Sequence, residues 1–293
     1  MIVPTPHGPV DSAVAVKSTF EAGLGTNAHP VPRTAPARFR AQVLFTWAAL
    51  VVVLGGLLSS LGLSYGLIGQ KLPFLLGLRL SPDGFLQGAA LSLFITAVSL
   101  VFACTVGAVT ALGRLSRNPI AFAVATFYGS IFRGTPLLVQ VLLIYLALPQ
   151  IGIVLGALSS GVIALSLNYG AYLSEMIRSG ILSVPTGQRE AALALGLSRP
   201  VVAWKVVAPQ ALRVMIPPAG TQFVSMLKDS SLVSIMGLWE LNFLAQSYGR
   251  ASYRYMEMLI TAAAIYWLMS IAFELVQQRL ERRFGRGHTP RDR

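Results

Sequence analysis

Several of the side chains that could do chemistry in this chain interrupt long apolar segments. Arg133 directly precedes Gly134-Thr135-Pro136, Lys228 and Asp229 stand together in a later segment, and Glu175 lies near the end of another. An ionisable group at membrane depth is costly, so it generally faces the interior of a helix bundle or a wet cavity. Such groups either line a path for a polar solute or form internal ion pairs that brace the bundle.

Catalysis and metal binding are poorly supported by the residue types. The one cysteine, Cys104, lies in an apolar segment, and the three histidines lie outside every apolar segment. An intramolecular disulfide is therefore impossible, and the cysteine and histidines do not have the spacing of a zinc site. A phosphate-binding GxxxxGK[ST] loop is also missing, since none of the four lysines follows a glycine. We expect no enzyme activity, no metal site and no cofactor in this chain, so its energy source must be another polypeptide or an ion gradient.

The composition favours lipid as the surrounding solvent. Hydrophobic residues make up 54% of the 293 residues and charged residues only 12%, about half the charged share of a soluble domain. A net charge of +12 could suggest nucleic acid. However, the basic residues are spread over the short segments between apolar runs, so we expect a membrane protein that binds no nucleic acid.

The apolar runs predict an all-α, polytopic bundle of about six transmembrane helices. A spanning helix needs about 20 mostly apolar residues. The predicted spans are 42–63, 86–112, 121–148, 156–178, 213–236 and 257–278. The third span should be broken at Gly134-Thr135-Pro136, because proline removes a backbone donor and frees carbonyl groups that need other partners.

Lysine and arginine in the short loops predict that both termini lie inside. The residues placed inside are Lys17, Arg33, Arg38, Arg40, Arg114, Arg117, Arg178, Arg189, Arg199, Lys205, Arg213, Arg279, Arg282, Arg283, Arg286, Arg291 and Arg293. Those placed outside are Lys71, Arg79, Arg250 and Arg254.

Four regions follow from this topology. We expect a disordered cytoplasmic tail at 1–40, an extra N-terminal transmembrane helix and outer loop at 41–71, a core at 72–280 and a basic cytoplasmic tail at 281–293. The arginines at 279, 282, 283 and 286 fall on one helical face. They either contact anionic headgroups or simply stop translocation.

The cytoplasmic loop 179–212 carries two predicted short helices. Gln188 to Leu195 is rich in helix-forming residues, and Gly196 is placed to end that helix. Ser198 can cap a second helix with Pro200 in its first turn, and Pro209 should close it. Small residues on the first helix suit either docking into a groove of a partner or packing against the chain's own bundle.

Three segments, in order, are similar to those of the permease subunits of ABC importers for polar amino acids. They are YGSIFRGTPLLVQ at 128–140; Glu190-Ala191-Ala192, Gly196 and Val206-Val207-Ala208-Pro209; and SMLKDSSLVS at 225–234, followed by Gly237 and Glu240-Leu241. The resemblance covers about residues 72–280. It implies a core of five spans, which makes the span at 42–63 an N-terminal addition. One departure is Val-Val-Ala-Pro where the family usually has Ile-x-Leu-Pro, a change that keeps the apolar character.

The resemblance implies a function and a set of partners. The chain would form the translocation path of a binding-protein-dependent importer in a bacterial inner membrane. It would work with an ATPase dimer that holds ATP and magnesium, a second permease subunit and an extracytoplasmic solute-binding protein. The residues implied to couple to the ATPase are Glu190, Ala191, Ala192 and Gly196. Candidates for the path or the substrate are Arg133, Thr135, Pro136, Gln140, Lys228, Asp229 and Ser230.

Other interpretations stay open at this point. Arg133, Lys228 and Asp229 either contact the zwitterionic part of an amino acid or only form ion pairs, and Glu175 is expected to pair with Arg178, one turn away. The alternative function is a secondary amino acid transporter driven by an ion gradient. That class favours carboxylates near mid-membrane and an internal repeat, and we find no repeat. Acidic, amide, basic and opine-type substrates are all compatible with the sequence.

Overall fold

The computed structural model describes residues 37–284 in two units, the first ending at Gly62 and the second beginning at Leu63. We describe each unit by itself. The predicted tails at 1–40 and 281–293 lie almost entirely outside the described residues, as does Arg286, so their predicted roles stay predictions.

The first unit is one apolar helix, α2 (Ala37–Ser60). Its segment Ala41–Ser60 has a mean hydropathy of 2.1 and no residue buried within the structure. Twenty apolar residues span about 30 Å as a helix, which matches the hydrocarbon layer. This helix corresponds to the predicted span 42–63.

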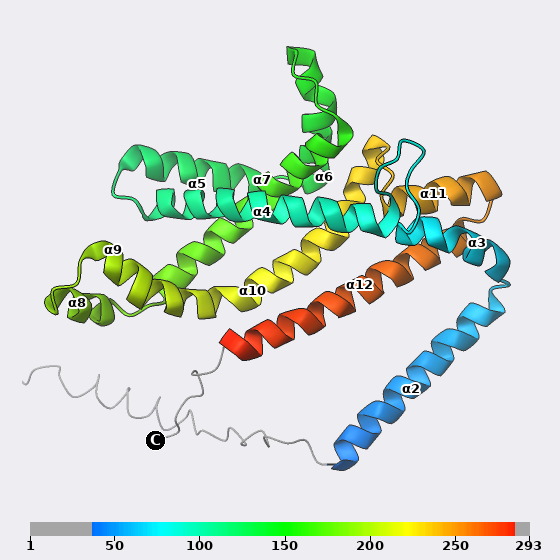
Figure 1. Ribbon diagram of the computed structural model, residues 1–293, viewed down its shortest axis with the longest axis horizontal. Coiled ribbons are helices and arrows are strands. Elements are labelled where there is room, and N and C mark those ends of the chain that lie inside the picture. Colours follow the sequence, from blue (N-terminus) through cyan, green and yellow to red (C-terminus); the bar gives the residue numbers. More distant parts are fainter. Residues whose placement is uncertain (1–36, 285–293) are drawn as a thin grey trace, which may run out of the picture. The chain divides into compact units, whose positions relative to one another are not determined.

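The second unit is a bundle built around two long helices, α4 (Gly88–Leu115) and α7 (Ala157–Leu182), which pack along each other (Figure 1). A side chain at Gly107 would place its Cβ 3.0 Å from that of Leu173 and 3.1 Å from the carbonyl oxygen of Gly170. Glycine therefore allows the two backbones to approach closely, as small residues do between transmembrane helices.

The remaining long helices complete the bundle. They are α5 (Pro119–Gly134), α10 (Ala208–Asp229), which continues as the 3₁₀ segment η4 (Ser230–Met236), and α12 (Tyr255–Phe284). In Figure 1, α5 folds back beside α4, and α12 lies along α10. The core between α4, α7, α10 and η4 is apolar, with fully buried Leu165, Met226 and Val233.

The predicted break of the third span is confirmed. Helix α5 ends at Gly134, and α6 (Leu137–Leu142) continues through the π-helical η1 (Leu143–Ala147) and the 3₁₀ segment η2 (Leu148–Ile151). The two halves meet at an angle of 105°. Span 121–148 is thus not one straight helix but a strongly bent pair.

Within residues 37–284, three helices are long and apolar enough to cross a membrane by themselves, or four if the bent pair is one span. The all-helical bundle is as predicted, and the count of six stays a prediction. Helices α7 and α10 are not among these membrane-crossing candidates. α7 buries small polar residues such as Ser160 and Asn168 against its neighbours, and α10 contains Pro217 and Pro218. A helix surrounded by other helices needs less apolar surface than one that faces lipid.

The segments expected to be outer loops contain two further helices. α3 (Tyr65–Leu76) and α11 (Leu241–Ser252) pack with α4 and α12 around buried Leu75, Leu244 and Met258. The predicted boundary between residues 71 and 72 falls inside α3. These helices bury one apolar face against the bundle, which is why they are ordered although they are too short to span.

The Glu240 carboxylate is buried where α4, α11 and α12 meet. It caps α11 by accepting hydrogen bonds from the backbone N–H groups of Asn242 (2.9 Å) and Phe243 (2.7 Å). It also accepts from the hydroxyls of Ser92 (3.2 Å) and Tyr266 (2.8 Å). Burial is the largest influence and raises the pKa of Glu240 to about 7, although these donors act in the opposite direction.

This raised pKa predicts that the chain loses stability as the pH rises. Between the ordinary carboxyl value and about 7, the folded state binds the proton that the unfolded state has released. Folding stability should therefore decrease with rising pH, by about 3 kcal/mol up to pH 8. In E240Q, this decrease should disappear from the melting temperature measured in detergent between pH 5 and 8. E190Q, at an exposed glutamate, is the control and should keep the wild-type decrease. If the melting temperature of E240Q falls with pH as much as that of the wild type, Glu240 is not the group responsible.

Candidate translocation and coupling sites

A cavity of about 480 Å³ opens beside the bend between α5 and α6. Its lining comes from the end of α5, the bend, the middle of α7 and the end of α10. The lining residues are Arg133, Gly134, Thr135, Pro136, Leu137, Asn168, Tyr169, Tyr172, Gln222 and Asp229. Four predicted path residues, Arg133, Thr135, Pro136 and Asp229, are thus brought together on one cavity.

Gln140 of α6 stabilises the bend by hydrogen bonds to residues on the α5 side. Its Nε2 donates to the carbonyl oxygens of Phe132 (3.0 Å) and Thr135 (3.1 Å) and to the Thr135 hydroxyl (2.8 Å). Asn168 of α7 donates to the same Phe132 carbonyl (3.0 Å) and to the amide oxygen of Gln140 (3.1 Å). The carbonyls that the helix break releases therefore find side-chain donors. Gln140 is buried, so its position is that of a brace.

Asp229 faces the cavity, whereas its neighbours in sequence do not. Its Oδ2 accepts a hydrogen bond from the Tyr169 hydroxyl at 2.7 Å. Lys228 lies on a separate groove between α10 and α12, and Ser230 is fully buried and donates to the Leu227 carbonyl. Among the described residues, Lys228 and Asp229 form no ion pair. The interpretation of these two residues as an internal pair is therefore wrong.

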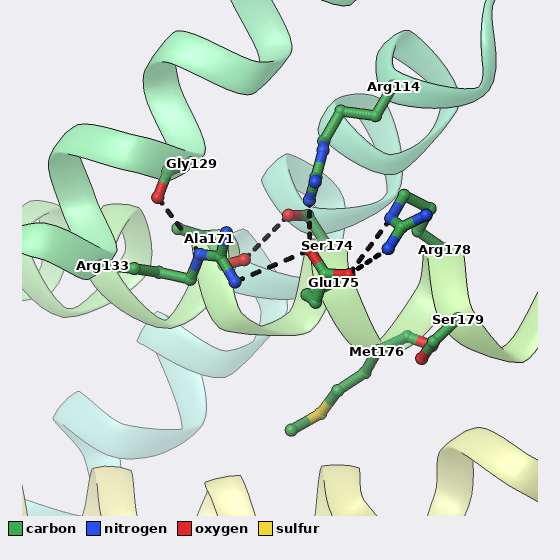
Figure 2. Close-up of polar contacts among 9 residues, drawn as sticks. All are labelled: Arg114, Gly129, Arg133, Ala171, Ser174, Glu175, Met176, Arg178 and Ser179. Atoms are coloured by element: carbon green, nitrogen blue, oxygen red, sulfur yellow. Dashed lines mark hydrogen bonds and ion pairs between the residues drawn. The ribbon is translucent and has the colours of Figure 1, made fainter.

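Glu175 is the centre of an arginine cluster (Figure 2). The expected pair with Arg178 is confirmed, with Nε 3.1 Å from Oε1. Arg114 from the end of α4 also binds Glu175, and Nη1 of Arg133 lies 3.6 Å from Oε2. One carboxylate thus ties together α4, α5 and α7. Arg133 belongs both to this cluster and to the cavity.

The loop 179–212 folds into a helical hairpin at one end of the second unit (Figure 1). Its elements are α8 (Thr186–Ala194), α9 (Arg199–Val202) and the π-helical η3 (Ala203–Val207). As predicted, Gly196 ends α8. It has φ +81°, its N–H donates to Leu193 and the N–H of Leu197 donates to Ala192. These two bonds form a Schellman motif, whose left-handed residue is normally glycine.

The predicted coupling residues divide into two groups. Ala192 is 6% exposed and packs inside the hairpin against Val184, Val202 and Val207. Glu190, Ala191 and Gly196 are exposed. Docking and self-packing therefore do not exclude each other, because α8 buries one face in the hairpin and leaves another face exposed.

Two details of the loop differ from expectation. Pro209 does not close the second helix, because α9, η3 and α10 run on as one helical segment in which Pro209 occupies the first turn of α10. Proline lacks the N–H that bonds within a continuous helix, and Pro209 follows the π-helical η3, where the α-helical bonding pattern is already interrupted. Ser198 is in the expected capping position but makes no side-chain capping bond.

The comparison with known families gives a match over residues 103–286, to the family described as "Binding-protein-dependent transport system inner membrane component". The chain belongs to this family. It is therefore a multi-pass membrane permease subunit, and the resemblance based on the three segments is confirmed.

Individual members of the permease family align over about two thirds of the chain. The L-cystine transport system permease protein TcyB of Bacillus subtilis is 42% identical over 194 residues, 66% of this chain and 82% of the relative. The glutamine transport system permease protein GlnP of Escherichia coli K12 is 35% identical over 200 residues, which are 68% of this chain and 91% of the relative. The fold also matches a chain in a crystal structure of an amino acid ABC transporter with histidines, with a TM-score of 0.67 and 36% sequence identity. The match covers 75% of this chain and 97% of the other chain.

The structure adds cavity residues of this permease that the sequence analysis did not single out: Tyr169, Tyr172 and Gln222. One signal was available. Asn168, Tyr172 and Glu175 follow the i, i+4, i+7 spacing that places side chains on one helical face. The contact of Arg114 with Glu175 had no such signal, because the two residues are 61 positions apart.

Proposed function

We propose that this chain is the permease subunit of an ATP-driven importer of amino acids in a bacterial inner membrane. The observation that carries the proposal is the cavity beside the bend, where a guanidinium (Arg133) and a carboxylate (Asp229) both line one space. An amino acid carries one group of each opposite charge. The relatives named for cystine, arginine and glutamine support this class.

The exposed face of α8 is the proposed contact with a separate ATPase. Glu190 and Ala191 face outward there, while Leu195 and Trp204 add large exposed apolar side chains to the same hairpin. An exposed apolar surface rimmed by polar groups is typical of an interaction site. ATP and magnesium would reside on that partner, and a second permease subunit and a solute-binding protein would complete the importer.

Reconstitution tests the function. The chain is inserted into proteoliposomes with its ATPase, its binding protein is added, and uptake of radiolabelled L-cystine, L-arginine, L-glutamine and L-glutamate is measured. We expect uptake of at least one amino acid that requires ATP and continues after ionophores have removed all ion gradients. Uptake that needs a proton or sodium gradient and no ATP would instead establish a secondary transporter.

A further inference from the structure

The Glu175 cluster carries more positive than negative charge. Three guanidinium groups and one carboxylate lie within ion-pair distance, so the cluster has a net charge of +2. Among the described residues, Arg114, Arg133 and Arg178 have no other acidic partner, and the buried Nε of Arg114 has no acceptor. Arg133 lies in a predicted membrane segment, and its side chain is only partly exposed, so a cluster with excess positive charge favours a further anion there.

Arg133 is the member of the cluster that can reach a second anion. It is held least closely, at 3.6 Å, whereas Arg178 contacts Glu175 through two nitrogens. Its side chain is 34% exposed, against 15% for Arg114. It also lines the cavity, and Figure 2 shows it approaching Glu175 from α5 on the side opposite Arg178.

Glu175 would keep its remaining partners if Arg133 left. Arg114 and Arg178 bind its two carboxylate oxygens separately. Breaking a buried ion pair is costly mainly because it leaves one charge unpaired. The loss of Arg133 avoids this cost, since the Glu175 carboxylate stays paired.

We infer that Arg133 is shared between two carboxylates: Glu175 in the empty permease and the α-carboxylate of an amino acid in the loaded one. Glu175 is then a positioning residue that holds Arg133 ready at the cavity and competes with the substrate for it. This inference rests on the proposed function. Asp229, which lines the same cavity and accepts a hydrogen bond from Tyr169, receives the substrate ammonium group.

The presence of Asp229 selects among anions. A free phosphate or an anionic lipid headgroup also binds arginine, but in this cavity it would meet the carboxylate of Asp229 without offering it a cation. An α-amino acid satisfies both charges at once.

The exchange predicts an unusual direction of effect. E175Q removes the competitor, so it should bind the amino acid more tightly, with a Kd about two- to fivefold lower, the range for a partly exposed ion pair. R133Q should raise the Kd at least about tenfold. Decarboxylated analogues (cystamine, agmatine and 4-aminobutanamide) should respond to neither substitution. A purely structural role of Glu175 would instead weaken the binding of both kinds of ligand.

The experiment is equilibrium binding of radiolabelled L-cystine, L-arginine and L-glutamine, and of their decarboxylated analogues, to the permease–ATPase complex in nanodiscs without nucleotide. An unchanged or higher Kd in E175Q for an amino acid that the wild type binds overturns the exchange alone. Binding of none of these amino acids by the wild type also overturns the exchange, whereas the proposed function falls only if ATP-driven uptake is absent as well. If E175Q does not assemble, E175D serves, because its shorter carboxylate withdraws from the most distant partner, Arg133, and should also lower the Kd.

Discussion

Reversing the charge of Glu190 is expected to lower ATP-driven uptake by at least about tenfold without unfolding the chain. Glu190 is exposed on α8 and, among the described residues, forms no ion pair. E190R therefore leaves no group of its own chain unpaired. At the proposed ATPase contact, however, it would place like charges together or leave a partner's charge uncompensated, at a cost of several kcal/mol. Uptake into proteoliposomes measures the effect.

Arg117→Glu provides the matched control. Arg117 is an exposed charge on the same predicted side of the membrane, between α4 and α5, and lies outside the hairpin. Its reversal should leave uptake within about twofold of wild type, because exposed charges away from an interface contribute little. Equal uptake by E190R and wild type would remove Glu190 from the contact.

Neutralising Asp229 is the second large effect that we expect. In D229N the side-chain amide oxygen can still accept the hydrogen bond from Tyr169, so the cavity keeps its shape while it loses the negative charge. A hydrogen bond to a charged group contributes about 1.5–3 kcal/mol. We therefore expect amino acid affinity to fall about ten- to hundredfold.

The comparison uses equilibrium binding and uptake, with Asp83→Asn as the matched substitution. Asp83 is exposed in the segment between α3 and α4, away from the cavity. Its neutralisation should change neither Kd nor uptake. An unchanged Kd and rate in D229N would show that Asp229 does not contact the substrate.

Local signals in the sequence predicted much of this structure. The bend at Gly134-Thr135-Pro136 and the helix that ends at Gly196 both depend on backbone properties of single residues, which are written in the sequence itself. The long apolar helices follow from the solvent that the chain must match. These features depend little on which helices become neighbours.

Features that depend on tertiary packing could not be predicted in the same way. Helices α3 and α11 are ordered because they bury one face against α4 and α12. Pro209 lies in α10, which continues directly from the π-helical η3, so it does not end a helix. Glu175 meets Arg114 because α4 and α7 lie side by side. Each result required knowledge of the neighbouring element.

Lys228 and Asp229 illustrate a prediction that the sequence could have refined. Adjacent residues in a helix point about 100° apart, so neighbouring charges need not face the same space. In the structure, Asp229 lines the cavity and Lys228 a different groove. The elements packed around the end of α10, together with helical phase, separate two residues that their charges had suggested to be partners.

The central claim, that the outer face of α8 contacts a separate ATPase, is tested most directly by disulfide crosslinking at two adjacent positions. Cys104 is exposed and would be replaced by serine. In that background, Ala191→Cys places a thiol on the exposed face of α8, and Ala192→Cys places one inside the hairpin. With single cysteines introduced along the ATPase surface, we expect crosslinks to position 191 and none to position 192. Crosslinks to neither position, or to position 192 alone, would contradict the account.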